Sequence, residues 1–176
     1  MDAESNIVLI GMPGVGKSTV GVLLAKTLSR GFIDTDVLIQ SREGRRLQEL
    51  LNEFGRQAFV EIESRHVRSL DCRGHVISTG GSVVYGDEAM QHLKSLGVVV
   101  HLDLTCELLQ ERLRRTDERG VVKDRNQSIC QLYAERQPLY RRYADVRVDC
   151  EGLKHEEVVS RIIEELGKKG LRKAAG

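Results

Sequence analysis

The chain has 176 residues, of which 40% are hydrophobic and 30% charged, and its formal net charge at pH 7 is +1. These values predict one globular domain, and the near-zero charge gives no indication of a nucleic-acid or membrane partner. No apolar run is long enough to cross a bilayer, and the acid-containing start at residues 1–6 does not resemble a signal peptide. We therefore expect a monomeric, cytoplasmic protein.

Short apolar segments alternate with longer amphipathic segments along the chain. The apolar segments predict five strands, at residues 7–10, 32–34, 75–78, 98–102 and 146–148. Helices are predicted at about residues 20–27, 47–54, 56–70, 88–95, 105–115, 126–142 and 158–166. Because the strands are apolar throughout and alternate with helices, the pattern predicts an α/β fold with a parallel sheet covered on both faces. We expect residues 1–176 to form a single domain with a frayed end at residues 168–176.

The four cysteines are widely spaced and form no pattern typical of a zinc site: Cys72, Cys106, Cys130 and Cys150. Cysteines of cytoplasmic proteins are normally reduced. We therefore expect separate thiols and no structural metal.

Residues 11–18, Gly-Met-Pro-Gly-Val-Gly-Lys-Ser, match the phosphate-binding pattern G-x-x-x-x-G-K-[ST] between a predicted strand and a predicted helix. Glycines allow successive backbone N–H groups to point toward an anion, and the helix start adds its positive dipole. In such a loop Lys17 reaches the β- and γ-phosphates, and the Ser18 hydroxyl group ligates Mg²⁺. We expect the loop to bind ATP through these residues: Gly11, Gly14, Val15, Gly16, Lys17, Ser18 and Thr19.

Two carboxylates, Asp34 and Asp36, follow the second predicted strand. In a parallel α/β sheet the carboxyl end of a strand borders the ligand crevice. One carboxylate can help to hold hydrated Mg²⁺, and the other can accept a hydrogen bond from an attacking hydroxyl group. The alternative is that this segment supplies the N-cap of a helix. Since the chain also lacks the N-K-x-D motif of GTPases, a kinase for a small acceptor is favoured.

The order of the motifs resembles that of the shikimate kinase family over about residues 6–150. The matching stretches are the phosphate-binding loop, F-I-D-T-D-x-x-I, G-R-Q-A-F-V-x-I-E, S-T-G-G, V-V-x-H-L-D-L, E-R-Q-P-L-Y and A-D. The resemblance implies phosphorylation of the 3-hydroxyl group of shikimate by ATP and Mg²⁺, a step of aromatic amino acid biosynthesis. It also implies a five-stranded parallel sheet flanked by helices, a substrate-binding segment at about residues 35–70 and a lid at about 116–125.

The resemblance further implies roles for individual residues. Asp34 would hold Mg²⁺ together with Ser18, and Asp36 would orient or deprotonate the attacking hydroxyl group. Arg136 would bind the substrate carboxylate, because a guanidinium can donate two parallel hydrogen bonds to it. The substrate-binding set is Asp36, Arg56, Glu63, Gly80, Gly81 and Arg136, and the catalytic set is Lys17, Asp36 and Arg119.

Two arginines belong to the predicted nucleotide and lid regions. Arg119 would contact the transferring phosphate from the lid. Arg112 would pack on adenine, although an arginine in this charged helix can equally belong to a solvated face.

Three departures from the family pattern leave the acceptor open. Val60 stands where the family has a second arginine for the substrate carboxylate, Ser82 replaces a glycine, and residues 119–122 read R-G-V-V where R-P-L-L is usual. Arg56 precedes Val60 by one helical turn, and we expect it to supply the missing guanidinium. The alternatives are a different small hydroxylated acceptor or a nucleotide-binding module without catalysis.

Overall fold

The computed structural model describes residues 4–115, 121–123 and 127–168. These residues contain a five-stranded sheet with the order β2-β3-β1-β4-β5, in which all neighbouring strands are parallel. The strands are β1 (Asn6–Ile10), β2 (Gly31–Asp34), β3 (His75–Ser78), β4 (Gly97–Asp103) and β5 (Val146–Asp149). The predicted five-stranded parallel sheet is therefore confirmed.

Within the described part of the chain, seven helices and one 3₁₀ turn connect and follow these strands. They are α1 (Lys17–Thr27), α2 (Thr35–Glu43), α3 (Leu47–Arg68), η1 (Val83–Tyr85), α4 (Asp87–Leu96), α5 (Cys106–Arg115), α6 (Ile129–Tyr143) and α7 (His155–Lys168). Helix α2 was not predicted, because it is short and its sequence is mostly polar. The two helices predicted at residues 47–54 and 56–70 form one element, α3, which is kinked at Gly55, where φ is 77° and ψ is 173°.

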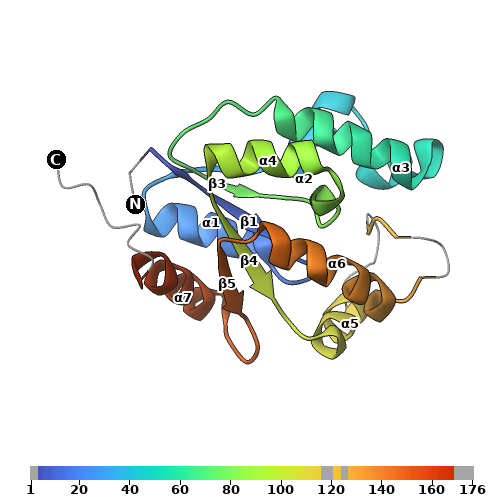
Figure 1. Cartoon of the computed structure of the whole chain (residues 1–176). Coiled ribbons are helices and arrows are strands. Elements are labelled where there is room, and N and C mark those ends of the chain that lie inside the picture. The colour runs from blue at the N-terminus through green and yellow to red at the C-terminus, as the bar shows by residue number, and fades with distance from the viewer. Residues whose placement is uncertain (1–3, 116–120, 124–126, 169–176) are drawn as a thin grey trace.

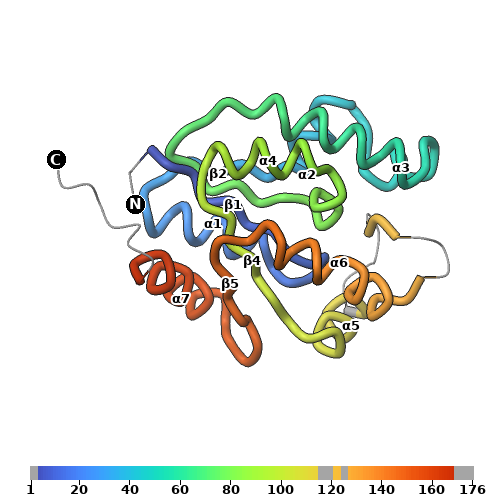
Figure 2. Tube along the Cα trace, in the orientation of Figure 1, coloured from blue at the N-terminus to red at the C-terminus, as the bar shows by residue number. Residues whose placement is uncertain are grey.

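Helices lie on both faces of the sheet (Figure 1). Helix α1 contacts β1, β2, β3 and α7, whereas α4 and α6 contact β4. The chain leaves β1 toward β2 in one direction and passes from β3 to β4 in the opposite direction. Because such crossovers are right-handed, α1 lies on one face and α4 on the other. The Cα trace also shows α5 beside α6, at the end of the sheet where β4 ends (Figure 2).

The main hydrophobic core surrounds the central strands. All five residues of β1 are buried, as are Val98 to Asp103 of β4. A second, smaller cluster consists of Ile39, Leu50, Phe59 and Val122. This cluster joins α2 and α3 to residues 121–123, at the carboxyl end of the sheet.

Cys106 and Cys130 form a disulfide that joins α5 to α6, with their Cα atoms 5.4 Å apart. The expectation of separate thiols is therefore wrong for this pair and holds for Cys72 and Cys150, which are free. The two bonded cysteines are 24 positions apart in sequence, and the packing of α5 on α6 brings them together.

Within the described ranges, no helix is both long and apolar enough to span a membrane. In the same part of the chain, no group of three or more His, Cys, Asp or Glu side chains could hold a metal ion.

Candidate active site

The phosphate-binding loop runs from the end of β1 to the start of α1. Gly11 has φ of 146°, and a Cβ at this position would lie only 2.4 Å from the carbonyl oxygen of Leu102 in β4. Gly16 is the N-cap of α1 with φ of 103°, and no side chain of the described residues caps this helix. The first backbone N–H groups of α1 therefore face the loop without a side-chain acceptor, which suits an anion.

Lys17 lies inside the loop, and its side chain is buried. Its Nζ donates hydrogen bonds to the carbonyl oxygens of Gly11, at 2.8 Å, and Met12, at 2.9 Å. Burial lowers the pKa of Lys17 to about 8, although the negative charge of Asp36 opposes this effect. A phosphate group beside Nζ would restore the preference for the charged form.

Asp34 and Ser18 lie at the carboxyl edge of the sheet. Asp34 pairs with Ser78 in the register of β2 and β3, and Oγ of Ser18 lies 3.4 Å from Oγ of Ser78. Oδ1 of Asp34 accepts hydrogen bonds from the backbone N–H groups of Asp36, at 3.0 Å, and Val37, at 3.3 Å. Asp34 is thus the N-cap of α2, as one of the two sequence-based alternatives proposed. The cap uses one carboxylate oxygen and does not conflict with a role beside Mg²⁺.

Asp36 lies in the first turn of α2 and faces a small cavity. Burial raises the pKa of Asp36 to about 6, and the charge of Asp34 adds to the rise, whereas Lys17 opposes it. A carboxylate with this pKa is well suited to accept a proton near neutral pH. The cavity measures about 20 Å³ and is lined by Pro13, Asp36, Leu47, Phe59, Gly80, Gly81, Ser82, Val122 and Arg136.

Arg136 is fully buried in α6, and most of its guanidinium is occupied by protein contacts. Nε donates to the hydroxyl group of Tyr85, at 3.1 Å, and Nη2 donates to the carbonyl oxygen of Val122. Nη1 has no hydrogen-bond partner among the described residues, and it lies 3.0 Å from the position of a Cβ on Gly81. A buried donor of this kind is costly unless a ligand satisfies it.

Arg56 extends from α3 toward the same region. Its guanidinium lies 4.7 Å from the ring centroid of Tyr85, and the guanidinium of Arg136 lies 5.1 Å from the same centroid. Nη2 of Arg56 also donates to Glu135, which accepts a hydrogen bond from the Tyr85 hydroxyl group at 2.7 Å. The structure therefore brings Arg56 and Arg136 together around one aromatic ring, while Val60 is a half-buried apolar residue.

Of the two remaining predicted arginines, the structure describes Arg112 and not Arg119. Nη1 of Arg112 donates to the carbonyl oxygen of Val15, at 3.2 Å, so Arg112 lies against the phosphate-binding loop. Arg119 lies outside the described residues, and its predicted contact with the transferring phosphate stays a prediction.

Three tyrosine and serine side chains shape the cavity without having been predicted to do so. The hydroxyl group of Tyr85 accepts the hydrogen bond from Nε of Arg136. Ser82 donates to Oε2 of Glu63 at 2.6 Å, and Tyr140 donates to the carbonyl oxygen of Gly81 at 2.7 Å. The sequence signals for them are that Ser82 departs from the glycine of the family pattern and that Tyr140 belongs to the stretch E-R-Q-P-L-Y.

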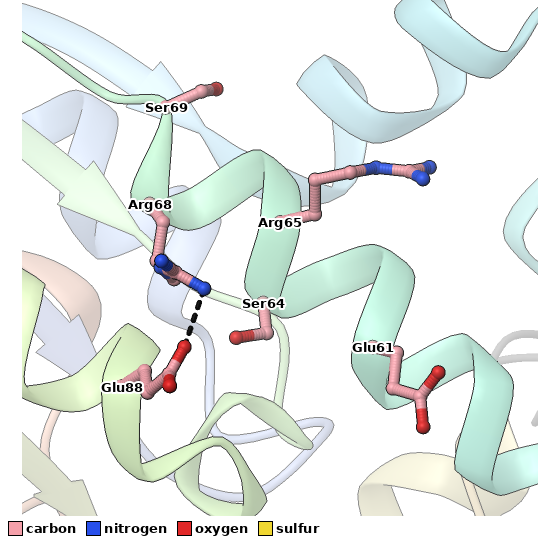
Figure 3. A pocket seen from close by; sticks show the side chains of 6 residues that line it. All are labelled: Glu61, Ser64, Arg65, Arg68, Ser69 and Glu88. Atoms are coloured by element: carbon pink, nitrogen blue, oxygen red, sulfur yellow. Dashed lines mark hydrogen bonds and ion pairs between the residues drawn. The ribbon is translucent and has the colours of Figure 1, made fainter.

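A second hollow lies apart from this cavity, on the outer surface of α3 and α4 (Figure 3). It has a volume of about 520 Å³ and is lined by Glu61, Ser64, Arg65, Arg68, Ser69 and Glu88. Arg68 forms an ion pair with Glu88 across the hollow, as Figure 3 shows, and Arg65 pairs with Glu43 at 3.1 Å. Both arginines of this hollow therefore already have an acidic partner.

Comparison with known proteins places this geometry among relatives. The profile of the shikimate kinase family matches residues 13–167. A shikimate kinase from Thermodesulfovibrio yellowstonii is 40% identical over 163 residues, which cover 91% of this chain and 94% of the relative. A shikimate kinase from Persephonella marina is 36% identical over 159 residues, with 90% and 96% of the two chains covered.

Solved structures agree with the sequence relatives. Shikimate kinase from Acinetobacter baumannii, solved in complex with shikimate, superposes with a TM-score of 0.86 at 28% identity, and 96% of each chain is covered. Shikimate kinase from Aquifex aeolicus superposes with a TM-score of 0.79 at 34% identity, with 94% of this chain and 98% of that chain covered.

Proposed function

The chain belongs to the shikimate kinase family, and we propose that it transfers the γ-phosphoryl group of ATP to the 3-hydroxyl group of shikimate. The observation that carries this proposal is the cavity beside the phosphate-binding loop, which Asp36 and Arg136 both line and near which Nη1 of Arg136 has no hydrogen-bond partner among the described residues. A base and a cation on one small cavity fit an acceptor that has both a hydroxyl group and a carboxylate.

The nucleotide would bind with its phosphates at residues 11–19. Backbone N–H groups at the start of α1 would donate to the phosphates, and Lys17 would exchange its two carbonyl partners for phosphate oxygens. Arg112 would contribute at the other side of the loop, where it already contacts Val15. The catalytic effect of this arrangement is positioning and neutralisation of charge.

Ser18 and Asp34 fit a Mg²⁺ ion, because a hydroxyl group and a carboxylate are oxygen ligands and Mg²⁺ keeps several water ligands in such sites. Both residues flank Ser78 at the same edge of the sheet. When bound, Mg²⁺ would neutralise charge on the β- and γ-phosphates.

Asp36 would accept the proton of the acceptor hydroxyl group while that group attacks phosphorus. Arg136 and Arg56, whose guanidinium groups both lie near the ring of Tyr85, would hold the acceptor carboxylate. Gly80, Gly81 and Glu63 would form the wall behind the acceptor. The lid predicted at about residues 116–125, with Arg119, lies mostly outside the described residues, and its role in excluding water from the reaction stays a prediction.

The remaining properties of the enzyme are proposals of the same kind. We place residues 1–176 in one kinase domain that acts as a monomer in the cytoplasm, with no nucleic-acid or membrane partner. The alternative of a different small hydroxylated acceptor rests on the departures at Val60, at Ser82 and at residues 119–122. The alternative of a nucleotide-binding module rests on the generality of the phosphate-binding motif.

A coupled assay of ADP formation tests the proposal. The assay contains Mg²⁺, ATP and either shikimate, no acceptor, or other hydroxy acids such as quinate. Formation of ADP that depends on shikimate, and of one shikimate phosphate per ADP, is the expected result. Stimulation by another hydroxy acid in place of shikimate would show that the acceptor is another compound. Nucleotide binding without stimulation by any acceptor would favour the nucleotide-binding module.

A further inference from the structure

Glu63 lies on α3 and is almost completely buried, with 1% of its surface exposed. Its Oε2 accepts a hydrogen bond from Oγ of Ser82, at 2.6 Å, and Ser82 is itself 2% exposed. Its Oε1 has no hydrogen-bond partner within the described part of the chain. The two oxygens of one carboxyl group therefore differ: one is held by the protein and the other is left for a further contact.

Oε1 of Glu63 points toward Gly80, and Gly80 lines the cavity in which we propose that the acceptor binds. A Cβ on Gly80 would lie 2.2 Å from Oε1 of Glu63 and 2.8 Å from Oδ1 of Asp36. Gly80 thus leaves room for oxygen atoms of two acids at one point. Gly80, Ser82 and Asp36 all line the cavity, so the free oxygen lies directly behind its surface.

The surroundings of Glu63 disfavour a negative charge. No Lys, Arg or His side chain of the described residues lies within ion-pair distance of Glu63, and Val60, three residues earlier on the same helix, is apolar. Burial costs more free energy for a charged carboxylate than for a neutral carboxylic acid, and the nearby Asp36 adds repulsion. The neutral acid also fits the hydrogen bonds better, since Oε2 accepts from Ser82 while a proton on Oε1 can be donated.

We propose that Ser82 is a positioning residue that orients Glu63, so that Glu63 meets the acceptor as a neutral acid and donates a hydrogen bond from Oε1 to an acceptor oxygen. This inference deepens the proposed function and rests on it, because the acceptor is the ligand of the cavity. It gives a reason for a serine at position 82, whose hydroxyl group satisfies a buried acid that lacks a cationic partner.

The electrostatics of the site agree with a neutral Glu63. Burial raises the pKa of Glu63 to about 8, and the charge of Asp36 on α2 raises it further, whereas the bond from Ser82, Arg136 on α6 and Lys17 on α1 lower it. The folded protein therefore keeps a proton on Glu63 between about pH 4.5 and 8 that the unfolded chain has lost. Acceptor binding should weaken as the pH rises through 8, because the donor on Oε1 is then lost.

The first experiment follows the Glu63 carboxyl group directly, in the full-length protein without an acceptor. The chain is labelled with ¹³C at glutamate carboxyl carbons, and Glu63→Gln assigns the signal. We expect a titration midpoint near 8 in the wild type, a higher midpoint in Ser82→Ala, and a return toward the wild-type value in Ser82→Thr. A midpoint near 4.5 in the wild type, or the same midpoint in Ser82→Ala, would overturn the proposal.

The second experiment measures kinetics over pH 6.5–9.5 for the same variants. Loss of one oriented hydrogen bond corresponds to about a tenfold change in affinity, so Ser82→Ala should raise the KM for shikimate about tenfold. Its kcat and its KM for ATP should change less than about twofold. Glu63→Gln has a permanent donor and should remove the rise in KM above pH 8.

The control is Ser95→Ala, which removes an exposed hydroxyl group that donates to the carbonyl oxygen of His92 at 2.7 Å. It should leave all constants unchanged. Wild-type protein that forms no ADP with shikimate would refute the proposed function, while the carboxyl titration would still decide whether Ser82 controls Glu63. Wild-type turnover with an unchanged KM in Ser82→Ala would refute only the inference.

Discussion

The hydroxyl group of Tyr85 accepts a hydrogen bond from Nε of Arg136, at 3.1 Å, and thereby fixes the orientation of a fully buried guanidinium. The ring of the same tyrosine lies beside Arg56 as well, 4.7 Å from its guanidinium. Two cations can approach each other around the ring because its π-electrons and Glu135 offset their charges. Tyr85 therefore links the two arginines that we assign to the acceptor carboxylate.

Two substitutions of Tyr85 should weaken acceptor binding to different degrees. Tyr85→Phe leaves Nε of Arg136 buried without a partner and should raise the KM for shikimate about tenfold. Tyr85→Leu also removes the ring and should raise it further, to about a hundredfold. Steady-state kinetics with varied shikimate and varied ATP measure both effects, and the KM for ATP should stay within about twofold of the wild-type value.

A second tyrosine provides the matched control for Tyr85. The hydroxyl group of Tyr143 donates to Asp87 at 2.7 Å, and Arg142 lies 5.1 Å from its ring centroid, away from the cavity. Tyr143→Phe should therefore leave the KM for shikimate unchanged. Equal effects of Tyr143→Phe and Tyr85→Phe would mean that Tyr85 acts only on stability.

Removal of Arg56 tests whether it replaces the guanidinium that the family has at position 60. A charge-assisted hydrogen bond contributes about 1.5–3 kcal/mol, so Arg56→Ala should raise the KM for shikimate by about tenfold to a hundredfold. Arg56→Lys should restore little of this loss, because an ammonium group lacks the planar fork. An exposed arginine that pairs with Glu53, Arg45, serves as the control in the form Arg45→Ala. An unchanged KM in Arg56→Ala would show that Arg56 only pairs with Glu135.

The parts of this fold that could be predicted are those with a local signal. Apolar runs of β-branched residues mark the strands, and the glycine pattern of residues 11–18 marks the loop between β1 and α1. Helix α2 has only the possible N-cap at its start as a signal, because its nine residues are mostly polar and show no clear helical period. The turn at Val83–Tyr85 is likewise too short to show a period.

The side-chain arrangement of the candidate site could be predicted only in part. Asp36, Glu63 and Arg136 could be named as site residues from motifs, and their roles stay predictions. The bond from Ser82 to Glu63 and the position of Tyr85 between two arginines depend on how α3, η1 and α6 pack. The Cys106–Cys130 disulfide was missed for the same reason, since residues far apart in sequence meet only through the packing of α5 on α6.

Gly80 should not tolerate a side chain. In Gly80→Ala the added Cβ would lie 2.2 Å from Oε1 of Glu63 and 2.8 Å from Oδ1 of Asp36, so one or both acids must move. Because a misplaced acceptor or base is costly to the reaction, kcat/KM for shikimate should fall about a hundredfold or more. Gly167→Ala is the control, since a Cβ there meets nothing within 4 Å and alanine favours the helix. Full activity in Gly80→Ala would show that the side chains of Glu63 and Asp36 can move away from Gly80 without loss of activity.

His101 should make the folded protein less stable in mild acid. It is 1% exposed in β4, its ring stacks on Tyr140 with the centroids 4.9 Å apart, and neither ring nitrogen has a hydrogen-bond partner within the described residues. Burial lowers the pKa of His101 from 6.5 to about 4, although Asp103 opposes the effect. Asp103 offsets little of the cost of a charged His101 ring. The two carboxylate oxygens of Asp103 already accept hydrogen bonds from Gln137 and Arg147, and Oδ1 lies 4.0 Å from Nε2 of His101.

The sign of the His101 effect follows from which state binds the proton. Between pH 6.5 and 4 the unfolded chain binds a proton that the folded protein excludes, so the free energy of unfolding falls as the pH falls through this window. From pH 7 to pH 5 the contribution of His101 amounts to about 2 kcal/mol. Urea unfolding at both pH values should show this loss in the wild type and less of it in His101→Phe, which keeps the aromatic stack and cannot titrate. An equal loss in His101→Phe would mean that other groups cause the acid sensitivity.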